Sequence, residues 1–268
     1  MSEPLIDVVA VSNHSGGSRW QAVVSRGPVA GVAGLRRIIP FGHDFLPSPA
    51  PATGAGAAEL TLHVEPLWRR RGLGSRLLSA VRGQSPGPRL VAIVAEGSPG
   101  EAFCLRHGFW YTGSRRHDLL SYGDVHQAWL GEMVEAEHPG YRLIHWTGDL
   151  AGTIRAEELL RRPSHTGNAT LTAVQAEGEL AAYAVAVVDA PWEPRARQYG
   201  PVVLPDHRGR RLGLWVNAAL IQRLRKVHSH VNEIEIASAE DESHLLALRR
   251  HLGFQPYRRT RRYELPPS

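Results

Sequence analysis

Two short stretches of the sequence place arginines and glycines at the start of an apolar helical pattern. They read RRRGLGS at residues 69–75 and RGRRLGL at residues 208–214. Where a strand ends and a helix begins, several backbone N–H groups have no partner inside the helix, and together they can bind an anion. Arginine side chains beside them can add charge-assisted hydrogen bonds, each contributing about 1.5–3 kcal/mol. Both stretches therefore predict a site for an anion such as a pyrophosphate.

The residue spacing distinguishes these turns from two common nucleotide-binding loops. A Walker A loop needs Gly-Lys-Ser/Thr and a Rossmann turn needs G-x-G-x-x-G, and the two stretches contain neither pattern. The formal net charge is +5 at pH 7, and basic runs at residues 69–71, 208–211 and 258–262 could contact nucleic acid. Because a solvated surface explains such runs as well, we do not expect a nucleic-acid partner.

The two turns belong to an internal repeat. When Arg69 is aligned with Arg208, the downstream segment LRHGF at residues 105–109 meets RHLGF at residues 250–254. The same alignment pairs Pro66 with Pro205, Leu73 with Leu212 and Gly74 with Gly213. A repeat of this length indicates two copies of one domain. We expect an N-terminal domain at residues 1–124, a linker helix at 125–139 and a C-terminal domain at 140–268.

The elements around each turn follow one order. Each copy should form a hairpin, a strand, the Arg-rich turn, a helix, a second strand, a second helix and closing strands after a Gly-Phe step. The hairpins should turn at residues 26–28 and 177–178, and apolar residues recur with helical spacing after each turn. Two strands joined by a crossover helix imply a partly parallel sheet with helices on its faces, which is the α/β class. The Pro/Ala/Gly-rich segment 42–59 predicts a mobile loop.

The motifs resemble those of a known enzyme family. RRRGLG, preceded by VEP and followed by LRHGF, closely resembles the coenzyme A signature of the GNAT N-acetyltransferases. RGRRLG with RHLGF resembles the same superfamily, in a form similar to actinobacterial members that carry HRGHRLGL. The two resemblances cover most of the chain, and the tandem arrangement is similar to that of mycothiol synthase.

This resemblance implies a fold, a co-substrate and a set of binding residues. It implies two tandem GNAT folds, each a mixed, partly parallel sheet flanked by helices, and transfer of an acyl group from acetyl-CoA or another acyl-CoA to an amine. The pantetheine arm would enter where the strand before the turn separates from its parallel neighbour. In the first copy the implied coenzyme-binding residues are Leu62, His63, Val64, Arg69, Arg70, Arg71, Gly72, Leu73, Gly74 and Ser75. In the second copy they are Val203, Arg208, Gly209, Arg210, Arg211, Leu212, Gly213 and Leu214.

The second copy departs from the family pattern at two positions. Pro201 removes one N–H donor from the strand before the turn, because its nitrogen carries no hydrogen. Arg211 stands where the pattern has glycine, and it could either crowd the phosphate or bind it. We therefore expect the first copy to bind coenzyme A better.

Acyl transfer to a protonated amine requires a base, and the leaving thiolate benefits from an acid. Glu59, His63 and Glu65 share one face of the strand before the first turn, and Tyr199 is the best polar candidate of the second copy. In many family members the acid is a tyrosine that lies four residues before the glycine of the Gly-Phe step. That position holds Cys104 in the first copy and Arg249 in the second, so neither copy has the usual acid.

Length and composition set the remaining expectations. The chain has 268 residues, one cysteine and no apolar run as long as a membrane span, and its N-terminus lacks a secretory pattern. We expect a cytoplasmic monomer or homodimer without a metal and without a membrane partner. The predicted function is acylation of an amine on a small molecule such as an antibiotic, an amino acid or another metabolite. The alternative is a catalytically weak coenzyme A-binding or regulatory protein in which one or both copies are structural.

Overall fold

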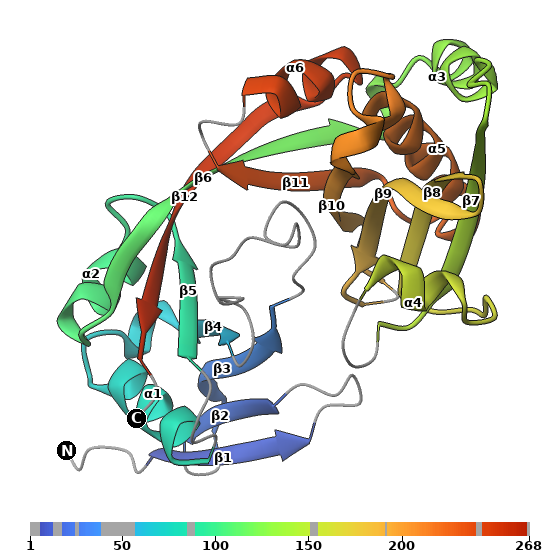
Figure 1. Ribbon diagram of the computed structural model, residues 1–268. Helices are drawn as coiled ribbons and strands as arrows, with labels where there is room; N and C mark the ends of the chain where they lie inside the picture. Colours follow the sequence, from blue (N-terminus) through green and yellow to red (C-terminus); the bar gives the residue numbers. More distant parts are fainter. Residues whose placement is uncertain are drawn as a thin grey trace. The chain divides into compact units, whose positions relative to one another are not determined.

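The protein folds into two compact units, which we describe separately (Figure 1). The computed structural model describes residues 6–12, 18–24, 27–38, 57–84, 89–150, 155–190, 192–239 and 243–266. Unit 1 contains the described residues of Met1–Ile38, Thr53–Ser114 and Thr260–Ser268, and unit 2 contains those of Arg115–Arg259. In the described residues no helix is long and apolar enough to cross a membrane.

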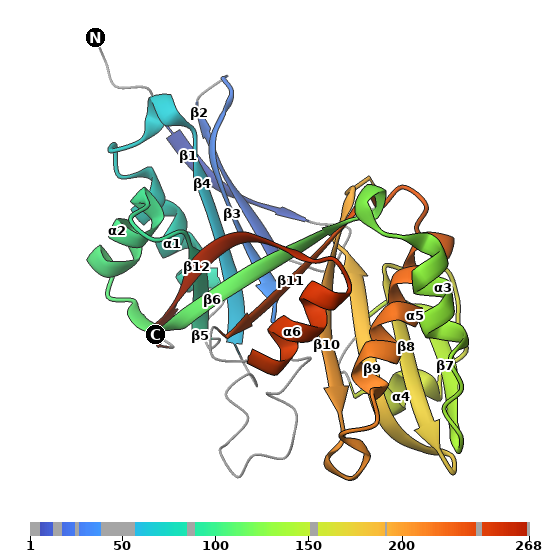
Figure 2. The same cartoon turned by 90° about the horizontal axis from the view of Figure 1, so that it is seen from above.

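Unit 1 is a mixed sheet with two helices on one face. Strands β1 to β4 are antiparallel neighbours in sequence order, and β4 runs parallel to β5. Helices α1 and α2 lie together on one side of these strands in Figure 2, and both contribute to one apolar core. The bounds are β1 Ile6–Ser12, β2 Ser18–Val24, β3 Val29–Arg37, β4 Ala57–Val64, β5 Arg89–Val94, α1 Leu73–Gln84 and α2 Pro99–Arg106.

The apolar stripe predicted for the first crossover helix forms the centre of this core. Leu73, Leu77, Leu78 and Val81 are all nearly inaccessible to solvent, and they pack with Trp20 of β2. Spacing of three and four residues puts the four side chains on one face of α1, so the helix buries that face against the strands.

Unit 2 has helices on both faces of its sheet. Strands β7, β8, β9 and β10 are antiparallel neighbours, and β10 runs parallel to β11. One core contains residues of α3 and α5, and a second core contains residues of α4, which Figure 1 shows on the opposite side of the strands. The bounds are β7 Tyr141–Gly148, β8 Ala169–Ala176, β9 Glu179–Val188, β10 Arg195–Val203, β11 Glu233–Ala239, α3 Gln127–Glu135, α4 Ala156–Leu160, α5 Leu212–Val227 and α6 Ser243–His251.

The closing strands are exchanged between the two sequence copies. Strand β6, Trp110–Ser121, follows the Gly-Phe step of the first copy, yet its residues 115–121 pair with β11 in unit 2. Strand β12, Gln255–Leu265, ends the second copy, yet its residues 261–265 pair with β5 in unit 1. The twelve strands therefore form a single sheet in the order β1-β2-β3-β4-β5-β12-β6-β11-β10-β9-β8-β7, whereas the sequence predicted one sheet per copy.

Most predicted elements are present at the predicted places. The hairpins turn between β2 and β3 and between β8 and β9, and α3 confirms the helix predicted after the first copy. The predicted loop at 42–59 extends three residues too far, because Ala57, Ala58 and Glu59 begin β4, and residues 42–56 lie outside the described residues. The chain passes from unit 1 into unit 2 at Arg115 and returns to unit 1 at Thr260. The boundaries at 124 and 140 concern the sequence repeat and stay a prediction.

Candidate functional site

In both units a parallel strand pair separates just before the Arg-rich turn. Strands β4 and β5 pair at three positions, the last of them Glu59 with Val91, and β10 and β11 pair at four, the last of them Gln198 with Ile236. Among the described residues, the rest of β4 and β10 has no parallel partner. Backbone N–H groups on that edge are then available to an extended ligand, such as a pantetheine arm with its two amides.

The two turns have the same backbone conformation. Positive φ angles occur at Arg70 (63°) and Gly72 (76°) in the first turn and at Gly209 (76°) and Arg211 (59°) in the second. These are corresponding positions, so each turn has one glycine and one arginine in the left-handed region, in opposite order. Arg211 therefore leaves the path of the turn unchanged. Its guanidinium adds a charge beside the N-terminus of α5, where an anion would bind.

The first arginine of each motif ties the turn to the end of the preceding strand. Nε of Arg69 donates to the carbonyl oxygen of Val64 at 2.9 Å, and Nε of Arg208 donates to that of Val203 at 3.5 Å. Both arginines are exposed, and the contact shows that part of their role is to hold the turn.

The remaining arginines of the turns have different surroundings. Arg71 lies over the ring of Trp68 at 5.2 Å, while Nη1 of Arg210 donates to the hydroxyl of Tyr141 at 2.5 Å. That hydroxyl also lies 3.1 Å from Nδ1 of His207. Tyr141, the first residue of β7, therefore binds Arg210, which was predicted from the sequence to bind the coenzyme.

The second glycine of each motif allows close helix packing. A Cβ added to Gly74 would lie 2.9 Å from the ring of Phe103 on α2, and one added to Gly213 would lie 3.3 Å from Leu248 on α6. A Cβ added to Gly72, by contrast, would meet no atom of the described side chains within 4 Å, so its neighbourhood is open. Ser75 lies in the first turn of α1, and its hydroxyl oxygen is 3.0 Å from Nε2 of His107, a residue of the LRHGF segment.

The proton-transfer candidates of the first copy differ in accessibility. The carboxylate of Glu59 accepts two hydrogen bonds of 2.8 Å from Arg36 and is mostly enclosed. His63 and Glu65 lie 3.4 Å apart, and both side chains are more than half exposed. Tyr199 lies on β10 and packs against the core on the α4 side. Glu59, His63 and Glu65 therefore belong to unit 1, and Tyr199 belongs to unit 2.

Neither residue at the position of the family's tyrosine can act as a surface acid. Cys104 is 2% exposed, and burial, together with the nearby Glu101 carboxylate, raises the pKa of its thiol to about 11. Arg249 is equally buried, and its Nη1 donates to Asp118 at 3.2 Å and to Ser238 at 2.7 Å. Both residues belong to the interior of their units.

Two features of unit 2 were not predicted from the sequence. Between Tyr199 and Val202 the register of β10 against β9 shifts, whereas β4 pairs with β3 without a shift. Such a bulge bends a strand and leaves backbone groups unpaired, which suits a ligand site. The second feature is a contact of 2.7 Å between His117 of β6 and Glu235 of β11. The strand exchange creates it, and no spacing in the sequence signals it.

Comparison with known proteins identifies the fold. The structure matches a tandem GNAT protein from the clavulanic acid biosynthesis pathway with a TM-score of 0.65 and 25% identity, covering 96% of this chain and 86% of that one. A GCN5-related N-acetyltransferase from Kribbella flavida matches with a TM-score of 0.55 and 15% identity, covering 89% of this chain and 88% of that one.

A third structure, a GCN5-related N-acetyltransferase from Sphaerobacter thermophilus, matches with a TM-score of 0.54 and 14% identity, covering 92% of this chain and 80% of that one. No protein-family model matches the sequence, and no curated protein matches it. The repeated motif, the separating strand pairs and these similarities agree, and the chain has a fold similar to that of tandem GNAT proteins.

Proposed function

We propose that the protein is an acyl-CoA-dependent N-acyltransferase that uses acetyl-CoA or another acyl-CoA and acylates an amine on a small molecule. An antibiotic, an amino acid or another metabolite would be such an acceptor. The observation that carries the proposal is the separation of β4 from β5 and of β10 from β11, each before an Arg-rich turn that leads into a helix. A separated strand pair can hold pantetheine, and the turn can hold the pyrophosphate.

In this proposal the chain contributes binding and orientation. The N–H groups at the starts of α1 and α5 would bind the pyrophosphate, with charge added by Arg70 in the first turn and by Arg211 in the second. N–H groups of β4 or β10 would hold the thioester carbonyl and stabilise the negative charge that develops on its oxygen. The coenzyme supplies the activated acyl group.

A second candidate function is coenzyme A binding with little catalysis. It is favoured by the ion pair between Glu59 and Arg36, which occupies the most enclosed carboxylate of the first site, and by the buried state of Cys104. In the second turn, the contact of Arg210 with Tyr141 removes one arginine from the set available to a phosphate.

The test uses the two positive-φ positions that correspond to each other, Gly72 and Arg211. Gly72→Asp and Arg211→Asp each place a carboxylate beside one turn, and aspartate tolerates the left-handed region better than most residues. The matched controls Gly72→Asn and Arg211→Asn have the same shape without the charge. Thiol release from acetyl-CoA is measured with a panel of amines, together with acetyl-CoA binding by calorimetry.

We expect the aspartate variant of each coenzyme-binding turn to weaken acetyl-CoA binding by about 10-fold or more relative to its asparagine control. A carboxylate about 5 Å from a phosphate repels it by roughly 3 kcal/mol at an effective dielectric constant of 20, before screening by salt. Equal binding by both aspartate variants and their controls would overturn the assignment of both turns. Binding without thiol release from any amine would favour the second candidate function.

A further inference from the structure

We propose that a pocket between α3, α5 and β7 of unit 2 binds the phosphate group of a small molecule. The three elements lie side by side in Figures 1 and 2, and the pocket has a volume of about 200 Å³. Its lining residues are Val134, His145, Ala219, Gln222, Arg223 and Lys226. The inference goes beyond the proposed acyl transfer and does not depend on it.

The polar side chains of the pocket come mainly from one face of α5. Four lining residues occupy positions i, i+3, i+4 and i+7, which lie on one side of a helix: Ala219, Gln222, Arg223 and Lys226. Nε1 of Trp215 donates to the carbonyl oxygen of Val134 at 3.0 Å, so the end of α3 is attached to α5. The pocket therefore has an amide, a guanidinium and an ammonium group on one wall.

The sheet beneath α5 is polar, although a sheet face covered by a helix is usually apolar. His145 of β7 pairs with Thr172 of β8, and two positions further along β7 Thr147 pairs with Thr170 on the same face. Thr170 and Thr172 are inaccessible to solvent. The hydroxyl oxygens of Thr147 and Thr170 are buried and have no hydrogen-bond partner among the described residues. This part of unit 2 is therefore suited to a polar ligand.

The positive charges of the pocket are not neutralised by neighbouring carboxylates. In the described part of the chain, Arg223 and Lys226 have no ion-pair partner, and the buried Nε of Arg223 has no hydrogen-bond acceptor. The lining itself contains no carboxylate. Partial burial and the charges of Arg223 and Lys226 lower the pKa of the His145 imidazole. His145 is therefore neutral at pH 7, and its pKa reports a positive potential in the pocket.

His145 adds a further donor to this set. Its Nδ1 lies 3.0 Å from the hydroxyl oxygen of Thr172. When that hydroxyl donates to Nδ1, the imidazole proton is on Nε2, which can donate to a ligand. A phosphate monoester offers three acceptor oxygens and a charge of about −1.5 to −2, whereas a carboxylate offers two oxygens and one charge. Two cations and two neutral donors, Gln222 and His145, therefore match a phosphate group better.

The pocket is separate from the Arg-rich turn of the same unit. Arg223 follows Arg211 by twelve residues, which is about 18 Å along a helix that rises 1.5 Å per residue. A phosphate bound at Arg223 would therefore not occupy the site proposed for the pyrophosphate. The volume corresponds to roughly seven water molecules, which limits the ligand to a phosphate group with a few further atoms.

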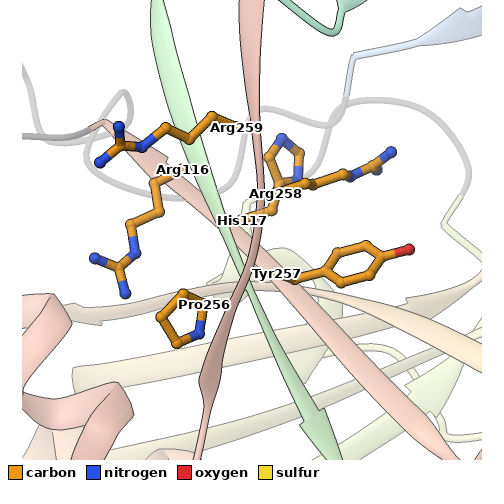
Figure 3. A pocket seen from close by; sticks show the side chains of 6 residues that line it. All are labelled: Arg116, His117, Pro256, Tyr257, Arg258 and Arg259. Atoms are coloured by element: carbon orange, nitrogen blue, oxygen red, sulfur yellow. The ribbon is translucent and has the colours of Figure 1, made fainter.

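Unpaired cations distinguish this pocket from another one in unit 2. That pocket, of about 190 Å³, lies beside β6 and β12 and is also lined by arginines. Figure 3 shows Arg116 and Arg259 on one side of the crossing strands and Arg258 on the other. Arg116 pairs with Asp118 and Arg258 pairs with Glu235, so carboxylates of the protein already bind these guanidinium groups.

The test follows the imidazole resonances of His145 by NMR during titration with phosphate compounds. The probes are inorganic phosphate, glycerol 3-phosphate and glycerate, a carboxylate of similar size. His145→Asn identifies the resonances by their loss. The variants are Arg223→Gln and Lys226→Gln. Arg225→Gln is the matched control, because Arg225 belongs to the same helix but lies over the ring of Tyr122 at 5.1 Å. Thermal unfolding checks that each variant is folded.

We expect inorganic phosphate and glycerol 3-phosphate to shift the His145 resonances to saturation. Either ligand should also raise the pKa of His145, because a bound anion favours the imidazolium. Arg223→Gln and Lys226→Gln should each weaken binding by about 10-fold or more, and Arg225→Gln by less than about 2-fold. Glycerate should bind at least about 5-fold more weakly than glycerol 3-phosphate.

Four results would overturn the inference. Unchanged His145 resonances would show that the cations only stabilise the C-terminal end of α5. An equal loss of binding with Arg225→Gln would show a general effect of charge. Glycerate that binds as tightly as glycerol 3-phosphate would refute the preference for phosphate. Displacement of the bound phosphate by coenzyme A would assign it to an Arg-rich turn.

Discussion

The strand that follows each Gly-Phe segment pairs with a strand of the other sequence copy. A core mutation in that strand should therefore destabilise the unit that contains the other copy's Arg-rich turn. Leu265 and Leu120 stand eleven residues after Phe254 and Phe109, so they correspond in the repeat. Leu265 is 4% exposed in the core of unit 1, and Leu120 is fully buried in the core of unit 2. Leu265→Ala should therefore weaken unit 1, and Leu120→Ala should weaken unit 2.

The size of each effect follows from burial. Truncation of a buried leucine to alanine costs about 2–5 kcal/mol, with the larger values where the surroundings cannot relax. Leu265 is the last residue of β12, so we expect about 2–3 kcal/mol, and for Leu120, in the interior of β6, about 3–4 kcal/mol. For a unit of about 100 residues, 1 kcal/mol corresponds to roughly 5 °C in Tm, so Leu265→Ala should lower the Tm of unit 1 by roughly 10–15 °C.

Native-state hydrogen exchange read by mass spectrometry separates the two units. With Leu265→Ala, peptides that cover β5 and α2 should lose protection, while peptides that cover β8 and β9 keep it. Leu120→Ala should give the reverse pattern. Each variant serves as the control for the other. Lost protection within the copy that carries the mutation, and nowhere else, would refute the exchanged arrangement.

Three further predictions concern single residues. Gly72→Ala should lower the free energy of unfolding by about 1–2 kcal/mol, because φ at this position is 76° and a Cβ is disfavoured there. Arg211→Gly should raise the free energy of unfolding by up to about 1 kcal/mol, because φ is also positive at this position. Denaturant unfolding measures both changes. Cys104 should resist alkylation by iodoacetamide at pH 8 in the folded protein and react after denaturation, because its thiol is buried and its pKa is about 11. Glu235 has a folded-state pKa of about 2, below that of an unfolded glutamate. The ionised carboxylate therefore contributes up to about 3 kcal/mol to the free energy of unfolding. This contribution is complete above about pH 4.5 and is lost as the pH falls toward 2. Glu235→Gln should therefore flatten the acid-unfolding curve in that window, and an unchanged slope would contradict the assigned ion pairs.

Local elements were predictable because their signals are local. The hairpin of β8 and β9 turns at Glu177 and Gly178, both with positive φ, and glycine there is a direct sign of such a turn. The apolar spacing of Leu73 to Val81 likewise defines the buried face of α1 without knowledge of its partner. The turns were predictable for the same reason, since arginine, glycine and the start of a helix are adjacent in sequence.

Pairing between distant strands was not predictable in the same way. The alternating residues of β6 and β12 predict a strand but contain no signal that selects β11 or β5 of the other copy as a partner. Because the two copies are similar, each closing strand would also suit its own copy, and the choice depends on packing across the whole chain. Buried contacts such as Arg249 with Asp118 and Tyr263 with Glu101 join residues more than a hundred positions apart. They are visible only in the folded structure.

The same exchange changes how the two copies should be compared. From the sequence alone, the proton-transfer candidates of the first copy are two carboxylates and a histidine, and the candidate of the second copy is Tyr199. In the folded chain Glu59 is engaged by Arg36, while the second turn shares unit 2 with a bulged β10 and with His117 from the first copy's strand. Unit 2 thus contains residues from both copies of the repeat. If the second copy is the catalytic one, the first copy is still needed for the strand β6 that it contributes to unit 2, whether or not its own turn binds coenzyme A.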